Sequence, residues 1–314
     1  MGAVLLRYSI NRLVQTVVVL MGVSIIVFLM LYTLPGNPAK LMAGMKASPE
    51  TVTNIKHKLG LDRPLYVQYF RYMLNLAKGD LGTSYRYGRP VSEILGAAFP
   101  ATAVLAFLAI VIEIVLGLAG GILAAVKRKT FIDSFITVGS TFLICVPVFW
   151  LGMLLQYFFG LKLGWLPVSG YVPLDLSYLI LPAITLAAVS MALVLRLVRS
   201  SMLETAGAPF VTMARAKGLS ESRVIVRHQL KNALMPVVTF IGLDLGALMT
   251  GAVATEIVFN YPGVGLAMYQ AVLQRDLPVV VSGVLIMVFL YAVFNFIVDI
   301  LYGFINPKIR FQDG

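Results

Sequence analysis

The sequence predicts an all-α polytopic membrane protein with six transmembrane helices, a helical hairpin on the cytoplasmic side and a small external subdomain. The 314 residues are 59% hydrophobic and only 12% charged, whereas soluble proteins carry about 25% charged residues. The mean hydropathy is +0.90. Several apolar segments also reach the length of about 20 residues that a helix needs to cross a bilayer.

Six segments have this length. They are approximately residues 10–33, 101–126, 134–160, 178–198, 236–256 and 279–303. The first follows two arginines and resembles a signal peptide, but its apolar part is too long for one and lacks a small-residue cleavage site. We therefore expect a retained span. Pro147 and Pro182 are expected to kink or begin spans.

The segments between the spans define the predicted organisation. We expect a cytoplasmic N-terminus and first span (1–33), an external subdomain with its own helix and turn signals (34–98), a core of five spans (99–303) and a cytoplasmic tail (304–314). The core includes a long polar interruption at residues 199–235.

Basic residues predict the orientation of the spans. The N-terminus, residues 127–129, residues 196–235 and the C-terminus together hold 14 of the 25 Lys and Arg residues. The two short loops on the opposite side hold only Lys162 and Arg275. Because short cytoplasmic loops collect positive charge, we expect both termini in the cytoplasm of a multi-pass inner or plasma membrane protein.

The segment from Glu204 to Pro236 is predicted to form two short basic helices. Gly218 suits the left-handed conformation just past a helix end, and Ser220 is a favoured N-cap for the second helix. That helix is expected to end before Pro236, which would begin the next helix. Such a hairpin could lie on lipid headgroups or dock a cytoplasmic partner, and spacing alone leaves both open.

Motifs of enzymes and metal sites are missing from the sequence. It contains no phosphate-binding Gly-x-x-x-x-Gly-Lys-Ser/Thr loop, no His-Glu-x-x-His and no Gly-x-Ser-x-Gly. His57 and His228 fall on opposite sides of the membrane in the predicted topology, and Cys145 is the single cysteine. We therefore expect neither an enzyme nor a metal site.

Acidic residues within spans are costly and suggest function. For Glu113 and Asp299, an interhelical pairing is favoured over a role in a transport pathway. For Asp244, which lies between glycines, pathway lining and pairing are equally open. Glu256 precedes Phe259, Tyr261, Pro262, Gly263 and Gly265, a segment that must turn back toward the membrane. A gate and a rigid re-entrant turn are both open for it.

Small residues recur at intervals that allow close helix packing. Gly117 and Gly121 form one such Gly-x-x-x-Gly pair, and Gly242 and Gly246 form another. We expect neighbouring helices to approach closely at both pairs.

Ordered motifs along the whole chain resemble one transporter family. They are LPGNPA (34–39), LGLDRPLYVQY (59–69), GDLGTSY (79–85), ARAKGLSESRVIVRHQLKNALMPVV (214–238), EIVFNYPGVG (256–265) and FNFIVDILYGFINPKIR (294–310). Together they resemble permeases of ABC importers of the dipeptide/oligopeptide/nickel class. One departure is that Thr212-Met213-Ala214 replaces the Glu-Ala-Ala that begins the family's cytoplasmic motif, so contacts of that glutamate are not carried over.

The resemblance implies partners and roles for the hairpin. A second homologous permease subunit, two ATP-binding cassette subunits and an external solute-binding protein are implied. ATP and Mg would bind the partner subunits, with no cofactor on this chain and no nucleic acid. The implied ATPase-coupling positions are Ala214, Arg215, Ala216, Lys217, Gly218, Leu219, Arg223, Arg227, His228 and Pro236.

The sequence leaves alternatives open for the substrate and for the class of transporter. Within this family we expect dipeptides or oligopeptides, with nickel, glutathione or another small solute as the alternative. An ion-coupled secondary transporter would instead use the buried acids as ion sites, and a scaffold subunit would need no polar pathway. The absence of a visible internal repeat and the presence of the basic hairpin weigh against the secondary transporter.

Overall fold

The computed structural model describes residues 2–33, 39, 43, 47–173 and 175–305. These residues are overwhelmingly helical, with an isolated β-bridge between Thr83 and Pro90. The all-α prediction is confirmed. Most of the LPGNPA motif (34–38) and most of the predicted tail (306–314) lie outside the described residues.

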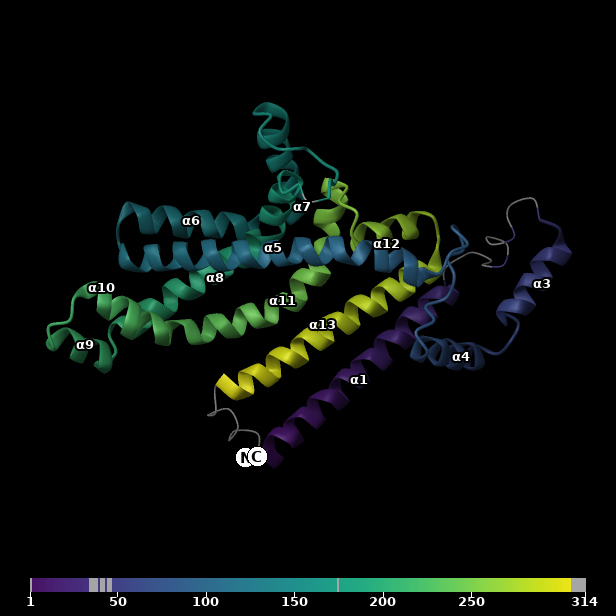
Figure 1. Cartoon of the computed structure of the whole chain (residues 1–314), viewed down its shortest axis with the longest axis horizontal. Coiled ribbons are helices and arrows are strands. Elements are labelled where there is room, and N and C mark those ends of the chain that lie inside the picture. The colour runs from purple at the N-terminus through teal and green to yellow at the C-terminus, as the bar shows by residue number, and fades with distance from the viewer. Residues whose placement is uncertain (1, 34–38, 40–42, 44–46, 174, 306–314) are drawn as a thin grey trace. The chain divides into compact units, whose positions relative to one another are not determined.

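Figure 1 shows the order of the helices along the chain. In chain order they are α1 (Gly2–Thr33), α3 (Pro49–Leu59), α4 (Leu65–Ala77), α5 (Val91–Val126), α6 (Phe131–Cys145), α7 (Val148–Leu155), the π-helix η1 (Gln156–Lys162), α8 (Ser177–Ala206), α9 (Pro209–Ala216), α10 (Glu221–Arg223), the π-helix η2 (Val224–Leu230), α11 (Lys231–Phe259), α12 (Val264–Leu273) and α13 (Leu277–Ile305).

The predicted spans are present, and one of them is broken. Among the described residues, five helices are long and apolar enough to cross a membrane, and the number reaches six if the pair α6 and α7–η1 counts as one span. That pair bends by 111°. Val146 and Pro147 at the bend have extended backbone conformations. The predicted effect of Pro147 is thereby confirmed, because proline has no N–H to continue the helix.

The chain divides into two compact units. Unit 1 comprises Met1–Thr102 and Pro262–Ala292, and unit 2 comprises Ala103–Tyr261 and Val293–Gly314. Residues 262–292 therefore pack with the N-terminal part of the chain, although they are far from it in sequence. The long helices α5 and α13 contribute to both units.

In unit 1, local signals define the two short helices α3 and α4 of the segment that was predicted to be external. The Ser48 hydroxyl caps α3 by accepting the Thr51 N–H at 3.2 Å, and Pro49 occupies the first helical position. Gly60 ends α3 in the left-handed conformation with φ of 69°. Tyr69 of α4 then bonds to Ser24 of α1 at 2.8 Å, which ties α4 to the first span.

A buried aspartate joins distant parts of unit 1. Asp276, just before α13, accepts hydrogen bonds from the Ser84 hydroxyl and from the backbone N–H of Tyr85 at 2.9 Å. Its side chain is buried. The nearby core consists of apolar residues of α5, α12 and α13. The 82–90 segment is thus held on the helices mainly by polar contacts.

Helix α8 is the centre of unit 2. It packs against α6, α7 and α11, and many of its side chains are buried. Gly117 and Gly121 of α5 make close approach to α8 possible, because a Cβ at Gly121 would lie 2.6 Å from the carbonyl oxygen of Leu195. The predicted role of this glycine pair is confirmed. Gly242 likewise contacts Val298.

One expectation about the hairpin is wrong. We predicted that its second helix ends before Pro236, but helical structure continues from Glu221 through η2 into α11, where Pro236 lies inside the helix. The wider π-helical turn of η2 precedes the proline by six residues or more. Membrane helices tolerate an internal proline where neighbouring groups satisfy the freed carbonyl. The first helix also starts later than expected, because Glu204 still belongs to α8.

Candidate functional site

The polar hairpin of unit 2 begins with a tight turn after α8. Gly207 follows the last residue of α8, and Pro209 takes the first position of α9. Proline is favourable there because the first N–H groups of a helix have no partner within it. The guanidinium of Arg215 reaches back and donates to the Ala206 carbonyl at 3.3 Å. The hairpin therefore leaves the membrane helix α8 at a defined angle.

The turn between the two hairpin helices is a left-handed cap at Gly218. Its φ is 74°. The Gly218 N–H donates to the Arg215 carbonyl at 2.9 Å, and the Leu219 N–H donates to the Ala214 carbonyl at 3.4 Å. These two bonds are those of a Schellman motif, in which glycine avoids the strain of a side chain. The prediction for Gly218 is confirmed.

The second helix starts where the sequence placed it. Ser220 is the N-cap residue, with extended backbone, although its hydroxyl makes no capping bond in the described part of the chain. Glu221 instead pairs with Arg215 across the turn, with Nη2 and Oε1 2.6 Å apart. Both side chains are largely exposed. The pair thus fastens the two arms of the hairpin to each other at the surface.

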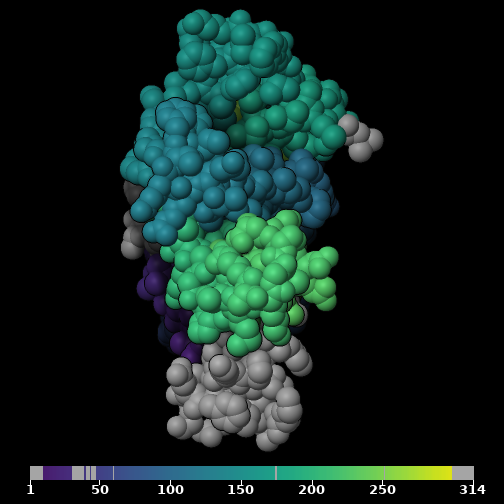
Figure 2. Space-filling view, turned by 90° about the vertical axis from the view of Figure 1, so that its left-hand side faces the viewer, coloured from purple at the N-terminus to yellow at the C-terminus, as the bar shows by residue number. Residues whose placement is uncertain are grey.

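The hairpin has a small core of its own. Val211 and Ala214 of α9 pack against Val224 of η2, and Leu219 covers the contact. The outward surface carries Arg215, Lys217, Arg223, Arg227 and Lys231, all exposed. Figure 2 shows this surface in green, open on the side that faces the viewer.

A second set of contacts anchors the hairpin to the spans. The buried Gln229 of η2 donates from Nε2 to the Met202 carbonyl of α8 at 2.7 Å. Ile225, Leu230 and Leu234 pack against a core formed by α5, α8 and α11. The predicted apolar side of the second helix is confirmed. The hairpin is therefore joined to α8 by a hydrogen bond and to α5, α8 and α11 by apolar packing.

The predicted coupling positions divide into an inner and an outer set. Ala214 is buried, while Leu219 and His228 are half-buried. The exposed positions are Arg215, Ala216, Lys217, Gly218, Arg223, Arg227 and Pro236. Pro236 lies within α11 and is separated from the turn by η2. The remaining outer positions are gathered on one continuous hairpin.

Two acidic residues predicted separately lie together in unit 2. Glu113 of α5 is fully buried, and its carboxylate neighbours that of Asp244 of α11. Among the described residues, both Glu113 oxygens and Oδ2 of Asp244 are buried and make no hydrogen bond of normal geometry. Buried acceptors of this kind suggest function. Lining of a transport pathway and structural pairing both stay predictions for Glu113 and Asp244. The side chain of Asp299 lies outside the described part of the chain.

The predicted turn after Glu256 is tightly packed. Phe259 and Tyr261 are fully buried, and Asn260 between them takes a left-handed conformation with φ of 47°. The Phe259 carbonyl accepts the Gly170 N–H at 2.9 Å. Pro262 is exposed, whereas Glu256, Gly263 and Gly265 are buried. The segment is therefore a well-packed turn, and a gate and a rigid re-entrant turn both stay predictions for it.

Three residues with clear roles escaped the sequence analysis. Gln229 was overlooked because a glutamine among basic residues suggests an exposed position. Asp133 forms a fork with Arg199, with Oδ1 and Nε 2.6 Å apart. An acid immediately before one predicted span (134–160) and a base immediately after another (178–198) were a usable signal. Asp276 gave no such signal, because its partner Ser84 is distant in sequence.

Comparison with known families decides the class of protein. Residues 117–311 match the family model described as binding-protein-dependent transport system inner membrane component. Residues 5–106 match the model for the N-terminal part of such membrane components. The chain belongs to this family. It is a membrane-spanning permease subunit of a binding-protein-dependent importer, and the resemblance noted in its motifs is confirmed.

Curated relatives match the permease over nearly its full length. The dipeptide transport system permease protein DppB of Alkalihalophilus pseudofirmus is 36% identical, with 98% of this chain and 100% of the relative covered. The di/tripeptide transport system permease protein DppB of Pseudomonas aeruginosa is 39% identical with the same coverage. The glutathione transport system permease protein GsiC of Escherichia coli K12 is also 39% identical, covering 98% of this chain and all of its own.

A solved structure shares the fold of the permease. It is the MetNI methionine ABC transporter in inward-facing conformations, with a TM-score of 0.57 and 19% identity, covering 68% of this chain and 96% of the matched chain. At this identity the likeness concerns the fold alone.

Proposed function

We propose that the permease imports short peptides and that its hairpin receives the mechanical work of ATP hydrolysis from separate ATPase subunits. The observation that carries this proposal is the architecture of the hairpin. It has its own core, it is anchored to α8 through Gln229, and its outer face is open. A rigid, exposed element that is firmly joined to spans is suited to transmit force.

The composition of the outer face favours a protein partner over lipid headgroups. Besides the basic residues, Phe210, Met213 and Val226 are exposed, with 42%, 60% and 62% of their surface accessible. Apolar anchors surrounded by charged residues are typical of protein interfaces. We infer that these three side chains enter a groove of an ATPase subunit, with the basic residues at the rim.

The distribution of basic residues supports a cytoplasmic hairpin. The loop between α5 and α6 carries Lys127, Arg128 and Lys129, and it lies at the same end of unit 2 as the hairpin (Figure 1). The Asp133–Arg199 fork joins the helices at this end. Positive charge collects on the cytoplasmic side. We therefore place the hairpin and both termini there, and residues 34–98 outside.

The remaining partners follow from the family. A second homologous permease subunit would complete the pathway, and an external solute-binding protein would deliver the substrate. ATP and Mg would bind two ATP-binding cassette subunits and not this chain. Closure of those subunits would move the hairpins, and the spans would then rock between inward-facing and outward-facing states.

Short peptides are the substrates best supported. The curated relatives transport dipeptides, di- and tripeptides, and glutathione according to their names. A peptide carries an α-amino group that an acidic side chain attracts. Glu113 and Asp244 offer such acids within the spans. Glutathione and other small solutes remain the alternative, and we include them as competing ligands in the transport assay.

Charge reversal in the hairpin tests the proposed coupling. Gly218→Pro combined with Arg223→Glu places a proline where φ is positive, which its ring forbids, and reverses one exposed charge. We expect transport and co-purification with the ATPase subunits to fall at least about tenfold, since two elements of the contact are lost. Membrane insertion is expected to be unchanged.

Lys127→Glu provides the matched control, because it reverses an exposed charge at the same end of unit 2 but outside the hairpin. This variant should bind the ATPase subunits and transport normally. Normal transport by the Gly218→Pro/Arg223→Glu variant would mean that the hairpin does not dock the ATPase. Transport by the permease without any ATPase subunit would point to an ion-coupled transporter instead.

Orientation can be tested separately with a membrane-impermeant maleimide. In a Cys145→Ala background, Arg86→Cys should react from outside intact cells, and Ser222→Cys in the hairpin should react only after permeabilisation. Both positions are exposed. Labelling of Ser222→Cys in intact cells would refute the proposed topology.

A further inference from the structure

A charged cavity of about 410 Å³ lies in unit 1. It is lined by Phe28 of α1, by the end of α3, by α4, by the segment 80–85 and by the first turns of α13, and it is open to solvent on one side. Its charged lining residues are Lys58, Arg63, Arg71 and Asp80. Three cations thus share a cavity with one carboxylate.

The cavity lining carries an excess of positive charge, with three cations and the carboxylate of Asp80. Within the described part of the chain, Lys58, Arg63 and Arg71 form no ion pair. Asp80 accepts the Gly82 N–H at 2.9 Å. The cations thus outnumber the carboxylate of Asp80 in the lining, and a bound anion would reduce the repulsion between the two guanidinium groups.

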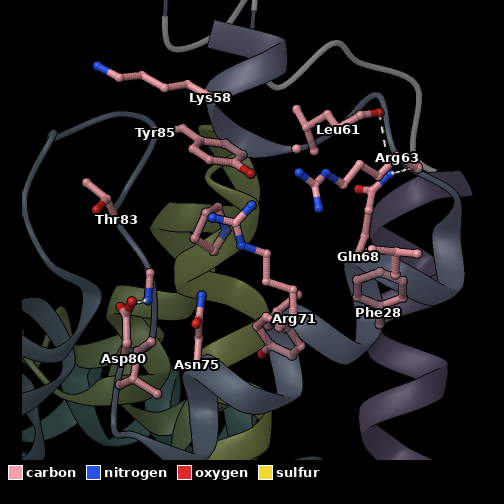
Figure 3. Close-up of a pocket in the computed structure, with 17 residues that line it drawn as sticks. Phe28, Lys58, Leu61, Arg63, Gln68, Arg71, Asn75, Asp80, Thr83 and Tyr85 are labelled. Carbon is pink, nitrogen blue, oxygen red and sulfur yellow. Dashed lines mark hydrogen bonds between the residues drawn. The ribbon is translucent and has the colours of Figure 1, made fainter.

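Local contacts hold the two arginines at the cavity. The side-chain amide of Gln68 donates to the Arg63 carbonyl at 2.6 Å, which fixes the turn between α3 and α4. The guanidinium of Arg71 lies against Gly60, since a Cβ at Gly60 would come within 3.2 Å of Nη1. In Figure 3 the two guanidinium groups enter the cavity from different sides, with the amide of Asn75 below that of Arg71.

Neutral hydrogen-bond donors add to the cations. Burial raises the pKa of Tyr72 to about 12, and its hydroxyl, like that of any tyrosine, carries a proton at neutral pH. That hydroxyl is buried and has no partner of normal geometry among the described residues. The neighbouring Ser282 directs its own hydroxyl to the Leu81 carbonyl at 3.0 Å. Tyr72 also lines the cavity.

The geometry favours phosphate over carboxylate. A single guanidinium fork already satisfies the two oxygens of a planar carboxylate. A tetrahedral phosphate presents oxygens in several directions and can accept from two guanidinium groups at once. The cavity offers two such groups and an ammonium at its rim.

The cavity also lies where two spans end. Phe28, near the end of the apolar part of α1, and Pro278, the second residue of α13, belong to its lining. Leu61, Val67 and Val281 extend the apolar part. Basic and aromatic residues beside apolar surface at the end of a span are typical of the membrane interface.

We propose that this cavity is a phosphate-binding site, in which Arg63 and Arg71 hold the phosphate group of an anionic lipid headgroup or of a soluble phosphate. Its occupant stabilises the contact of α3 and α4 with the spans. The site is independent of the proposed transport of peptides and of the hairpin.

Full-length permease in nanodiscs tests the site. One arm compares phosphatidylcholine alone with phosphatidylcholine containing a minor fraction of phosphatidylglycerol, and measures the retained anionic lipid by native mass spectrometry. The second arm adds inorganic phosphate or glycerol 3-phosphate to phosphatidylcholine nanodiscs and measures the unfolding temperature. We expect Arg63→Gln/Arg71→Gln to lower binding by roughly tenfold or more, because two charge-assisted contacts are lost.

Arg86→Gln/Arg89→Gln is the matched control. It removes two exposed charges of the same unit that do not line the cavity, and it should bind like the unchanged protein. Arg63→Lys/Arg71→Lys, which keeps the charge but not the fork, should restore part of the binding. Lys58→Gln at the rim offers a milder variant if the double arginine change does not fold.

The outcomes separate the two sources. An effect of phosphatidylglycerol alone assigns the site to a lipid, and an effect of free phosphate assigns it to a soluble ligand. If neither ligand binds or stabilises the unchanged protein, the proposal is wrong. It is equally wrong if the double glutamine variant binds as well as the control.

Discussion

The carboxylate of Asp276 accepts a hydrogen bond from the hydroxyl of Ser84, a residue 192 positions earlier in the chain. Backbone N–H groups of Tyr85 and Arg86 point to the same carboxylate, at 2.9 and 3.4 Å. Ser84 in turn accepts the Tyr87 N–H at 2.9 Å. One buried side chain therefore holds an entire loop against the start of α13.

Asp276→Ala is expected to destabilise unit 1 by about 2–3 kcal/mol, because it leaves several buried donors without an acceptor. The measurement is thermal unfolding of the purified permease. Asp175→Ala is the control, since Asp175 accepts two bonds from Ser177 in an exposed loop, and water can replace both bonds, so its loss should have a much smaller effect. Equal effects of the two changes would show that burial of Asp276 is unimportant.

Gly121→Ala is expected to separate α5 from α8. The new Cβ would lie 2.6 Å from the Leu195 carbonyl oxygen and from Val198 Cβ, so the helices must move apart at a cost of about 1–3 kcal/mol. In Gly139→Ala the added methyl group meets open space in α6. This control should be neutral or slightly stabilising. Thermal unfolding of both variants checks the difference, and an unaffected Gly121→Ala protein would contradict the observed packing.

The ion pair between Asp133 and Arg199 should stabilise the fold more than the exposed ion pair between Arg215 and Glu221. Asp133 is buried and also accepts the Lys129 N–H at 3.0 Å. Asp133→Ala leaves a partly buried guanidinium unpaired, with an expected cost of about 1–3 kcal/mol, which is reduced by the partial exposure of Arg199.

Arg215→Ala is the internal comparison for this prediction. Arg215 and Glu221 form the same kind of fork, with 41% and 59% of their side-chain surface exposed. Exposed pairs contribute only about 0–1 kcal/mol. The unfolding temperatures of Asp133→Ala and Arg215→Ala are measured at low and at high salt. High salt should weaken the exposed pair more than the buried pair. A larger loss from Arg215→Ala would reverse the expected order.

Gln229→Leu should uncouple transport from ATP hydrolysis if the hairpin acts as proposed. The change removes the bond to Met202 but leaves the outer face of the hairpin intact. ATPase subunits should therefore still bind, while transport per ATP hydrolysed falls about tenfold, which corresponds to roughly 1.4 kcal/mol.

Asn232→Leu is the control for Gln229→Leu. Asn232 bonds only to the His228 carbonyl of its own helix, at 2.8 Å, and is exposed. The ratio of transported peptide to ATP hydrolysed in proteoliposomes distinguishes the two variants. An unchanged ratio for Gln229→Leu would show that this bond does not transmit force.

The fold was largely predictable because its signals are local. Apolar length identified the spans, and Gly218 and Ser220 marked the turn of the hairpin from their own conformational preferences. Pro147 likewise marked the break between α6 and α7. Each of these signals acts within a few residues of the structure it determines.

Long-range contacts were not predictable in the same way. The pairing of Ser84 with Asp276 and the approach of Glu113 to Asp244 depend on how distant helices meet. Nothing in the neighbouring sequence of either residue carries that information. The convergence of Arg63 and Arg71 depends on the angle between α3 and α4, which a single turn at Gly60 sets.

The wrong prediction at Pro236 has a physical reason. Proline in a soluble helix removes a hydrogen bond and usually ends the helix. In this chain the residues before it are held in η2, where Gln229 bonds to α8 and Leu230 packs against the spans. Tertiary contacts therefore keep the backbone helical through a residue whose local preference is to begin a helix.

Helical structure runs without a break from Glu221 to Phe259. It therefore fixes which side of the bundle each residue of α11 faces. Each residue rotates an α-helix by about 100°, so one inserted or deleted residue between Lys231 and Phe259 would swing Asp244 and the buried Phe259 onto a different side of the bundle. The number of residues between Lys231 and Phe259 is consequently as constrained as their identity. The described residues of the loop after Lys162 are not helical and have no such phase, although Gly170 among them bonds to the Phe259 carbonyl.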